Sequence, residues 1–368
     1  MINSLIQKLK QVNDFRRPQG RRHELWIILM IVILGSMLGF NGYRPLEDFC
    51  NYYREQISIL LKISTNKIPS YSTIRRVILN LDYQHLTDIF NEWSKDLVDS
   101  QSPQQYLSID GKSLRNTLIH TFEKSQNFVV VVSLFNPENN LVLNLKFYEN
   151  KQSSEIKEVQ QMIRDTDLKN TTFTLDALHC QQKRIAQITT QNNNYIIPVK
   201  KNQKKLYDSL ESLAQEKREN RINIQYDYSR GRKLTRKVTL WDIEKILPTE
   251  IKNKFQGIKT LIKVERSGIR NKKKYQQTVY YITDRENNSV ELNQKIRDHW
   301  KIENKLHWVK DVIMKEDESK IKNITPAINI SILKTIALNL FRLLKFESIT
   351  KGQRWLSTRL SGLFTLLE

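Results

Sequence analysis

The sequence has little of what marks flexible linkers, disulfide-stapled scaffolds or zinc sites. Its 368 residues include only 10 glycines, 8 prolines and 2 cysteines. So little glycine and proline argues against long flexible linkers, and Cys50 and Cys180 form neither a CxxC motif nor a disulfide framework. A chain of this length is expected to form about two or three domains. Its cysteine usage predicts a reducing, cytoplasmic compartment.

A long apolar run, LWIILMIVILGSMLGF at residues 25–40, follows a group of arginines near the N-terminus. Its 16 residues fall short of the roughly 18 to 20 that span a bilayer. It ends without the small-residue pattern of a signal-peptide cleavage site, and a strongly basic remainder follows. We therefore interpret the run as a buried helix and predict no membrane association.

Acidic residues are scarce relative to basic ones, and the formal net charge is +21. The excess is concentrated between residues 199 and 280, which hold 22 Lys/Arg against 9 Asp/Glu, whereas residues 1–100 hold 13 against 10. Such a segment predicts a polyanionic partner, and nucleic acid is favoured over an anionic membrane surface. The lysines that open it are the first candidates for DNA contacts: Lys200, Lys201, Lys204 and Lys205.

The first hundred residues have helical periodicity throughout. After the apolar run, a second helix is expected from Pro45 to Leu61 and a further one at 84–99. Between them, 68–82 predicts a helix whose apolar stripe is Ile74, Val77, Ile78 and Leu81. Arg75 and Arg76 lie off that stripe, so this helix is either the DNA-contacting helix of a helix-turn-helix or an ordinary surface helix.

From Gln105 the periodicity changes to that of strands. Runs rich in β-branched and aromatic residues predict strands, and the turn at 136–140 predicts a hairpin. Helical patterns separate the later strands, which predicts a mixed-sheet α/β layer that the basic segment interrupts. The predicted strands are 106–110, 128–135, 141–148, 172–177 and 195–199, with helices from about 153, 179 and 291, and the interrupting segment has strand-like runs at 235–241, 258–265 and 277–283.

Three acids stand out in this layer. Asp110 and Asp176 are each expected to end a strand, at the sheet edge where open α/β sheets expose ligand-binding groups. Glu303 lies mid-helix, and at about 100° per residue it shares one arc with His299, His307 and Lys310. Ile302, Leu306, Val309 and Ile313 fill a different arc, which is expected to pack on the sheet. Such a helix could direct the carboxylate of Glu303 towards the two aspartates.

Each acid also has an ordinary structural interpretation. Asp110 precedes a glycine and could form a turn, Asp176 could cap the next helix, and Glu303 could pair with His307 or Lys310. Taken together, three carboxylates on these elements favour a site for hard divalent cations such as Mg²⁺, which prefers oxygen ligands. A pair of ions about 4 Å apart would suit phosphoryl transfer.

A zinc site on the same helix is a weaker alternative. His299, Glu303 and His307 are four residues apart, which is not the HExxH spacing, and zinc hydrolysis does not explain the net charge. Trp300 is expected beside this face and Trp308 nearly opposite it, so at least one of them is expected to pack in the core rather than act in the site. On that expectation, Trp308→Ala should lower the thermal stability.

Four segments carry a resemblance to a known family. YLSIDGKSLRNT, TLDALHCQ, YIIPVKKNQ and IRDHWKIENKLHWVKDVIMKED resemble motifs of the H-repeat-associated DDE transposases of bacterial insertion sequences. The first hundred residues, with DFRRPQGRRHELWIILMIVILGSMLGFNGYR, resemble the helical domain that precedes the catalytic core in that family. The resemblance covers nearly the whole chain, and its segment around Glu303 is the most specific.

The resemblance implies a helical N-terminal domain at 1–100 and a ribonuclease-H-like α/β catalytic domain at 101–368, interrupted by a basic β-rich insertion at about 200–285. It implies that Asp110, Asp176 and Glu303 form the catalytic triad and bind Mg²⁺, for which Mn²⁺ can substitute. Lys310 matches a lysine of the wider signature. The tyrosine and arginine of that signature are replaced here by Ile296 and His299, so Arg297 and His299 are the expected phosphate contacts.

The family also implies the partners and the reaction. The implied partner is DNA, both the terminal inverted repeats of an insertion sequence and the target DNA. The implied reaction is cleavage and transfer of DNA strands. The protein is expected to act as a homo-oligomer on DNA in the cytoplasm, associated with the nucleoid. The sequence departs from the family at Leu234, where a GRxExR motif often has glutamate.

The alternative to an active transposase is a catalytically inactive DNA-binding protein derived from such an enzyme. Inverted repeats and short target duplications in the DNA beside the gene would favour a mobile element.

Overall fold

The computed structural model describes residues 2–63, 67–97, 105–119, 126–217, 221–228, 233–255, 257–270, 273–286, 288–363 and 365. It divides into two compact units, each described here by itself. The first unit comprises Met1–Ser100, Gly111–Glu155 and Glu303–Glu368, and the second comprises Gln101–Asp110 and Ile156–Ile302. The division into domains at residue 100 stays a prediction.

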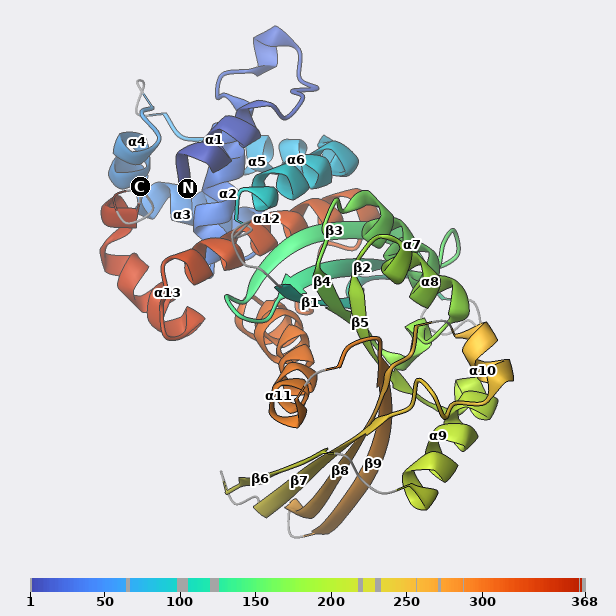
Figure 1. The fold of residues 1–368 in the computed structure, drawn as a ribbon. Helices are drawn as coiled ribbons and strands as arrows, with labels where there is room; N and C mark the ends of the chain where they lie inside the picture. The colour runs from blue at the N-terminus through green and yellow to red at the C-terminus, as the bar shows by residue number, and fades with distance from the viewer. Residues whose placement is uncertain are drawn as a thin grey trace. The chain divides into compact units, whose positions relative to one another are not determined.

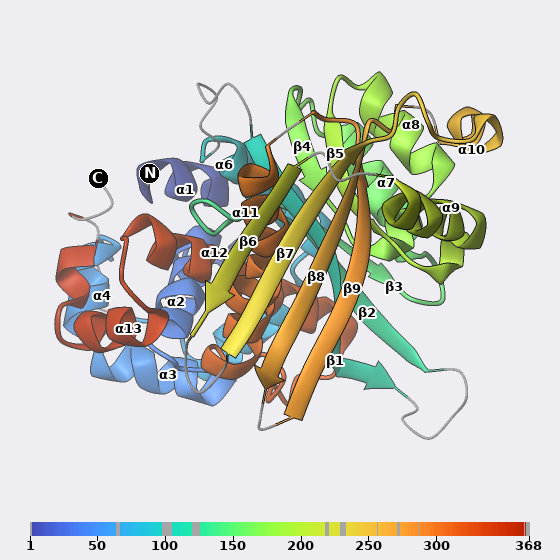
Figure 2. The ribbon, with the colours of Figure 1, turned by 60° about the horizontal axis from the view of Figure 1, so that its bottom comes forward.

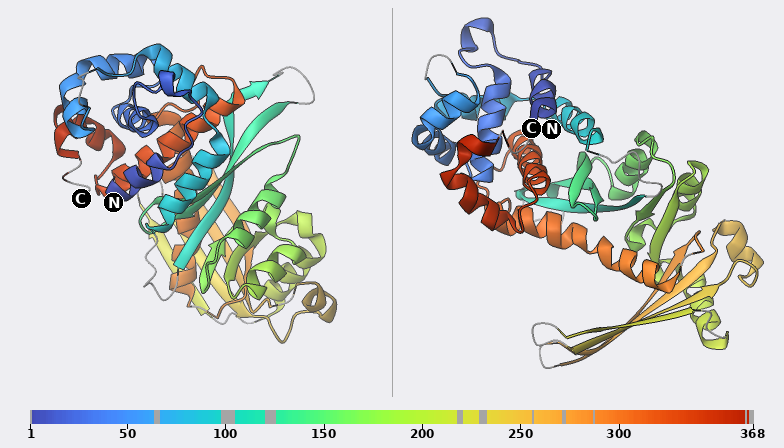
Figure 3. Two further views of the ribbon diagram at one scale, coloured as in Figure 1. Left: turned by 90° about the horizontal axis from the view of Figure 1, so that it is seen from above. Right: turned by 60° about the vertical axis from the view of Figure 1, so that its left-hand side comes forward.

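The N-terminal part of the first unit is helical, as predicted. The apolar run forms α2 (Leu25–Met37), in which every residue except Trp26 is buried. A helix that is apolar on all sides must be enclosed by other elements, and α2 packs against α1, α3, α5 and α12. Figure 3 shows these N-terminal helices in blue around the red α12. The helices are α1 (Ile2–Lys10), α3 (Tyr43–Tyr52), α4 (Arg54–Leu60), α5 (Tyr71–Asn80), α6 (Tyr83–Lys95), α12 (Ile324–Leu343) and α13 (Ile349–Thr358).

Helix α12 is the central helix of this unit. Among the described residues it alone is long and apolar enough to cross a membrane, and 83% of its most apolar window is buried within the protein. Two buried asparagines fix its position. Asn339 bonds both the N–H and the carbonyl of Val142, and Asn329 donates to the carbonyls of Ile78 and Leu81. These bonds satisfy polar backbone groups that burial would otherwise leave without partners.

The strands of the first unit are hydrogen-bonded in the order β3-β2-β1. The predicted hairpin is confirmed as β2 (Asn127–Asn136) and β3 (Leu141–Glu149), which pair antiparallel. The prediction that a strand ends at Asp110 is wrong, because β1 runs from Gln105 to Ile119 (Figure 1). The strand continues because its later residues join β2, where Thr117 Oγ1 accepts from the N–H of Val129 at 2.9 Å.

The second unit contains a mixed sheet in the order β1-β4-β5-β9-β8-β7-β6. Strands β1, β4 and β5 are parallel, and β9, β8, β7 and β6 continue the sheet antiparallel. The predicted basic strands are therefore confirmed, and β6 was missed. The bounds are β4 (Thr171–Thr174), β5 (Asn194–Val199), β6 (Arg221–Asp227), β7 (Lys233–Asp242), β8 (Thr260–Arg270) and β9 (Lys273–Thr283), with α7 (Glu155–Asp165), α8 (Gln182–Thr190), α9 (Lys204–Glu216) and α10 (Thr249–Lys254).

Helix α11 (Ser289–His299) lies against one face of this sheet, next to β6 and β7 (Figure 2). Asn288 caps it by accepting from the N–H of Glu291, and Glu291 in turn accepts from the hydroxyl of Tyr106 in β1 at 2.7 Å. Apolar side chains of the helix and strands form the shared core. This core comprises Tyr106, Ile196, Val238, Leu240, Ile262, Val264, Leu292 and Ile296.

After α11 the helical segment widens into two π-helical stretches, η4 (Ile302–His307) and η5 (Val309–Ile313). The predicted polar arc of His299, Glu303, His307 and Lys310 forms in part, because a carboxylate oxygen of Glu303 and a ring nitrogen of His307 lie within 4.8 Å of each other. Glu303 is exposed, whereas His307 and Lys310 are 3% and 2% exposed. Lys310 does not share that face and donates instead to Ser331 and Thr335. The i→i+5 bonding of a π-helix spaces successive residues differently from an α-helix, so the α-helical projection fails at Lys310.

The expectation that Trp300 or Trp308 is a core residue is also wrong, because they are 53% and 49% exposed. Trp308→Ala is therefore expected to lower the stability by about 1 kcal/mol or less, as for substitutions outside a core. Thermal denaturation of the purified variant checks this. A loss of several kcal/mol would mean that the indole is packed in solution.

Candidate active site

The two aspartates lie at equivalent positions on neighbouring parallel strands. Strands β1 and β4 pair from Gln105↔Thr171 to Ser108↔Thr174. Asp110 and Asp176 each follow two residues after that last pair. Asp176 therefore lies just past the carboxyl end of β4, and Asp110 lies beside it where β1 stops pairing with β4 but itself continues. That the two acids bind a ligand there stays a prediction.

A chain of hydroxyl groups joins the two strands beside these acids. Ser108 Oγ and Thr174 Oγ1 are 2.8 Å apart, and Thr174 Oγ1 is 3.0 Å from Nδ1 of His299, the last residue of α11. The first two side chains are buried and the imidazole is partly buried. These bonds fix the ring of His299 at the end of α11 against β4.

The electrostatics of His299 link it to both aspartates. Burial lowers the pKa of His299, and the charges of Asp110 and Asp176 oppose that shift without overcoming it. The imidazole is therefore neutral at neutral pH. A neutral ring beside two carboxylates leaves their negative charge available for a cation.

Asp176 also has the structural role that the sequence left open. It is the N-cap of a short 3-10 helix (Ala177–His179), and its Oδ1 accepts from the N–H of Leu178 at 2.9 Å. Nε2 of the buried His179 lies 3.8 Å from the same oxygen. The Asp176 side chain is nevertheless 46% exposed, so capping and metal binding are compatible.

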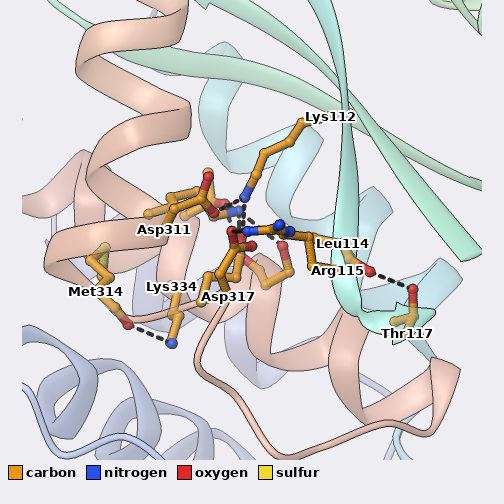
Figure 4. Close-up of polar contacts among 12 residues, drawn as sticks. Lys112, Leu114, Arg115, Thr117, Asp311, Met314, Asp317 and Lys334 are labelled. Atoms are coloured by element: carbon orange, nitrogen blue, oxygen red, sulfur yellow. Dashed lines mark hydrogen bonds and ion pairs between the residues drawn. The ribbon is translucent and has the colours of Figure 1, made fainter. Parts of the chain in front are cut away.

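Glu303 begins the segment Glu303–Glu368 of the first unit. A buried ionic cluster fixes the helix that carries it. Lys112, two residues after Asp110 in β1, donates to Asp311 and, at 3.0 Å, to Glu316. Lys310 Nζ lies 3.2 Å from Glu316 Oε1. Figure 4 shows Lys112 reaching Asp311. The strand that follows Asp110 and the helix that follows Glu303 are thus tied together within this unit.

Helix α12 completes the cluster. Lys310 donates to Ser331 Oγ at 2.9 Å and to Thr335 Oγ1 at 3.0 Å, and Lys334 donates to the carbonyl of Met314 at 2.6 Å (Figure 4). We name the cluster of Lys112, Lys310, Asp311, Glu316 and Lys334 the buried ionic cluster.

The charged groups of the buried ionic cluster shift one another's pKa values. Burial would raise the pKa of Glu316, but the lysines Lys310, Lys112 and Lys334 lower it to about 2. Burial lowers the pKa of Lys334 to about 8 and also lowers that of Lys310, whereas the acidic neighbours of Lys112 raise its pKa despite burial. The carboxylate of Glu316 therefore stays ionised in the interior because the lysines surround it.

The predicted DNA-contacting residues have different environments. Lys200, Lys201, Lys204 and Lys205 are exposed where α9 begins, and Lys205 pairs with Glu250 at 2.8 Å. The pocket beside them, of about 220 Å³, is lined by Lys204, Lys205 and Lys254 among others.

The other predicted contacts already have protein partners. Arg297 is exposed and donates to Gln225 Oε1 at 3.0 Å, and His299 bonds Thr174. Lys310 is enclosed in the buried ionic cluster, where it is suited to positioning the helix of Glu303 rather than to direct contact with phosphate. DNA contact by these three residues stays a prediction.

Sequence reasoning missed Lys112 and Glu316 because their partners are far away in the chain. It also missed Glu155, the first residue of α7. A Cβ on Gly111 would lie 2.5 Å from Glu155 Oε2, so the glycine makes room for this carboxylate directly after Asp110. The glycine in IDGK is the one feature of the sequence that could have indicated a side chain close to the backbone there, although a glycine equally indicates a turn.

Comparison with known proteins places the chain among the transposases. The model "Transposase DDE domain" matches residues 101–340, and the model "DDE_Tnp_1-associated" matches residues 6–94. The chain belongs to the H repeat-associated family of DDE transposases.

Its relatives include proteins of Escherichia coli. "Putative transposase YncI" of strain O157:H7 is 31% identical over 93% of this chain and 88% of its own length. "H repeat-associated putative transposase YhhI" of strain K12 is 28% identical over 92% and 90%. "Putative protein YbfL" of K12 is 29% identical over the same shares. The similarity therefore extends through both matched domains.

Proposed function

We propose that this protein is the transposase of an insertion sequence, which cleaves DNA at the element ends and transfers the freed strand to target DNA. The observation that carries the proposal is the position of Asp110 and Asp176, each two residues past the last pair of the parallel strands β1 and β4. We infer that β3-β2-β1-β4-β5 is the ribonuclease-H-like core and that β6 to β9 are its basic insertion.

Glu303 is the third carboxylate of the proposed site. The buried ionic cluster supports this role, because it ties the strand after Asp110 to the helix after Glu303 through Lys112 and Asp311. The exposed side chain of Glu303 is free of the apolar core and can reach a metal ion or DNA. A purely structural glutamate would be expected to take part in that cluster, as Glu316 does.

The donor set fits a hard divalent cation. Asp110, Asp176 and Glu303 offer carboxylate oxygens, which Mg²⁺ prefers and Mn²⁺ accepts. When bound, such ions stabilise the attacking and leaving oxygens of phosphoryl transfer. The chain itself holds the two aspartates in register, keeps His299 neutral beside them, and carries Glu303 on a helix fixed to α12.

The function is tested with purified protein and duplex DNA that contains an end of the element. Mg²⁺-dependent nicking at the end, followed by joining to a target duplex, is the expected result. Tight binding without cleavage in Mg²⁺ or Mn²⁺ would instead favour the inactive DNA-binding descendant. Failure to bind DNA at all would overturn both functions.

The lysines at the start of α9 are proposed to contact DNA backbone phosphates. Replacing Lys200, Lys201, Lys204 and Lys205 by glutamine should reduce the slope of log affinity against log salt by about 0.9 for each phosphate that the variant no longer neutralises. Fluorescence anisotropy at a series of salt concentrations measures this. Because Lys205 pairs with Glu250, restoring Lys205 alone should recover little of the slope. An unchanged slope in the quadruple variant would remove the cluster from the DNA-binding surface.

A further inference from the structure

The sheet face that packs on α11 carries arginines beyond its apolar core. Side chains alternate between the two faces of a strand, so Arg236 lies on the same face as the core residues Val238 and Leu240. In the register of β7 and β8, Arg236 is directly opposite Arg266. Arg297 on α11 donates to Gln225, which is directly opposite Arg236 on the other neighbouring strand, β6. Three guanidinium groups thus belong to one face.

These arginines lack acidic partners among the described residues. Arg236 donates from Nε to Asn293 Oδ1 at 2.5 Å, but its buried Nη2 and the buried Nε of Arg266 have no hydrogen-bond partner in the described part of the chain. Burial lowers the pKa of Arg236 to about 10, and the charges of Arg266 and Arg297 add to that shift. Like charges directly opposite each other destabilise a sheet.

The position where an acid could relieve this repulsion holds an apolar side chain. Leu234 is two residues before Arg236 on the same face and lies opposite Gly268 in β8. Asp227 lies opposite Leu234 on the other side and is exposed. A buried donor without a partner costs free energy. This face therefore has the charge and the unused donors of an anion site.

We propose that Arg236, Arg266 and Arg297 bind backbone phosphate of DNA on the face of the β6–β9 sheet that meets α11. Guanidinium groups suit this ligand because their planar donors pair with phosphate oxygens two at a time. Asn293 and Gln225 orient two of the three groups. The inference deepens the proposed function and rests on it for the identity of the ligand.

Arg266→Gln separates this role from a structural one. Removing one of two opposed charges should leave the melting temperature of the free protein unchanged or raise it, because the repulsion is relieved. The same variant should bind a duplex of about 30 base pairs with a log affinity–log salt slope that is shallower by about 1. Arg266→Lys, which keeps a charge, should retain most of the slope. A slope equal to that of the wild-type protein overturns the proposal, whatever the melting temperature does.

Lys274→Gln is the matched control. Lys274 is exposed in the same sheet but lies opposite Ile269 on the other face, so its loss should change the slope less than that of Arg266. Equal reductions of the slope in both variants would mean a general charge effect and overturn the assignment.

If Arg266→Gln does not fold, hydrogen exchange of the wild-type protein tests the site instead. DNA should protect the backbone amides of 234–238 and 264–268, and unchanged exchange there overturns the site.

The same experiments distinguish this inference from the proposed function. Wild-type protein that binds no duplex would overturn the proposed function and with it this site. Wild-type protein that binds and cleaves end DNA, with Arg266→Gln unchanged in slope, would overturn only the arginine site. Asp110→Asn, which removes a proposed metal ligand, should keep the wild-type slope.

Discussion

Replacing Glu316 by glutamine is expected to lower the melting temperature by roughly 10 °C, because breaking a buried ionic group costs about 3 to 5 kcal/mol. The carboxylate is 4% exposed and lies among Lys112, Lys310 and Lys334. Its loss would leave the buried Lys310 and Lys334 without their neighbouring carboxylate, whereas Lys112 would keep Asp311. Differential scanning calorimetry of the purified variant measures the effect.

Glu318→Gln is the matched control, since Glu318 is two residues away but pairs with Lys315 at the surface. Exposed pairs contribute about 0 to 1 kcal/mol, so the control should melt close to the wild-type protein. Adding Lys310→Met to Glu316→Gln should recover part of the loss, because it removes one unpaired cation. Equal melting temperatures for Glu316→Gln and Glu318→Gln would show that the cluster is not a structural centre.

The pH dependence of stability follows from the same groups. The folded pKa of Glu316 is about 2, below its ordinary value of 4.5, so the unfolded chain binds the proton more readily. Its stabilisation is fully present above pH 4.5 and is lost as pH falls towards 2. For Lys334, with a folded pKa of about 8 instead of 10.5, the penalty of burial is present below pH 8 and is relieved as pH rises to 10.5. Glu316→Gln should therefore flatten the acid side of the stability profile.

Glu303→Gln is expected to abolish strand cleavage, with a fall of at least about 10³-fold in rate, while DNA binding is kept or improved. Glutamine preserves the shape of the side chain but removes the charge that would hold a metal ion. Asp110→Asn and Asp176→Asn should behave alike, and a double variant should be little worse than a single one because the three would act as a unit.

The measurement is Mg²⁺- or Mn²⁺-dependent nicking of end-containing DNA by protein whose melting curve shows that it is folded. Glu318→Gln again serves as control and should cleave at the wild-type rate. Near wild-type cleavage by Glu303→Gln would remove this residue from the triad. A variant that binds DNA, stays folded and does not cleave supports it.

Local sequence patterns predicted many of the elements but not their long-range partners. The all-apolar run became the buried α2, the stripe of α5 is buried at Ile74, Val77 and Ile78, and the hairpin at 136–140 formed as expected. Strand β6 was missed because its apolar residues Ile222 and Ile224 are about half exposed at a sheet edge.

The positions of the two aspartates on neighbouring strands could be predicted from the sequence, but the contacts of the residues around them could not. Asp110 and Asp176 carry signals in their strands, but the continuation of β1 beyond Gly111 depends on pairing with β2 and on room for Glu155. Lys310 has an ordinary polar position on an α-helical projection. Its burial depends on Glu316, Ser331 and Thr335, which no local pattern connects to it.

The π-helical stretch η4 absorbs about one residue more than an α-helix would hold over the same rotation. Side chains after residue 307 therefore lie about 100° behind the positions that an uninterrupted α-helix would give them. If η4 closed into a regular α-helix without losing a residue, Lys310 would turn away from Ser331 and Thr335, and its buried partner Glu316 would lose a cation. Deletion of one codon within 302–307 would let the wide turn close while those later side chains keep their places, so it should disturb the buried ionic cluster less than a one-codon deletion in a regular α-helix.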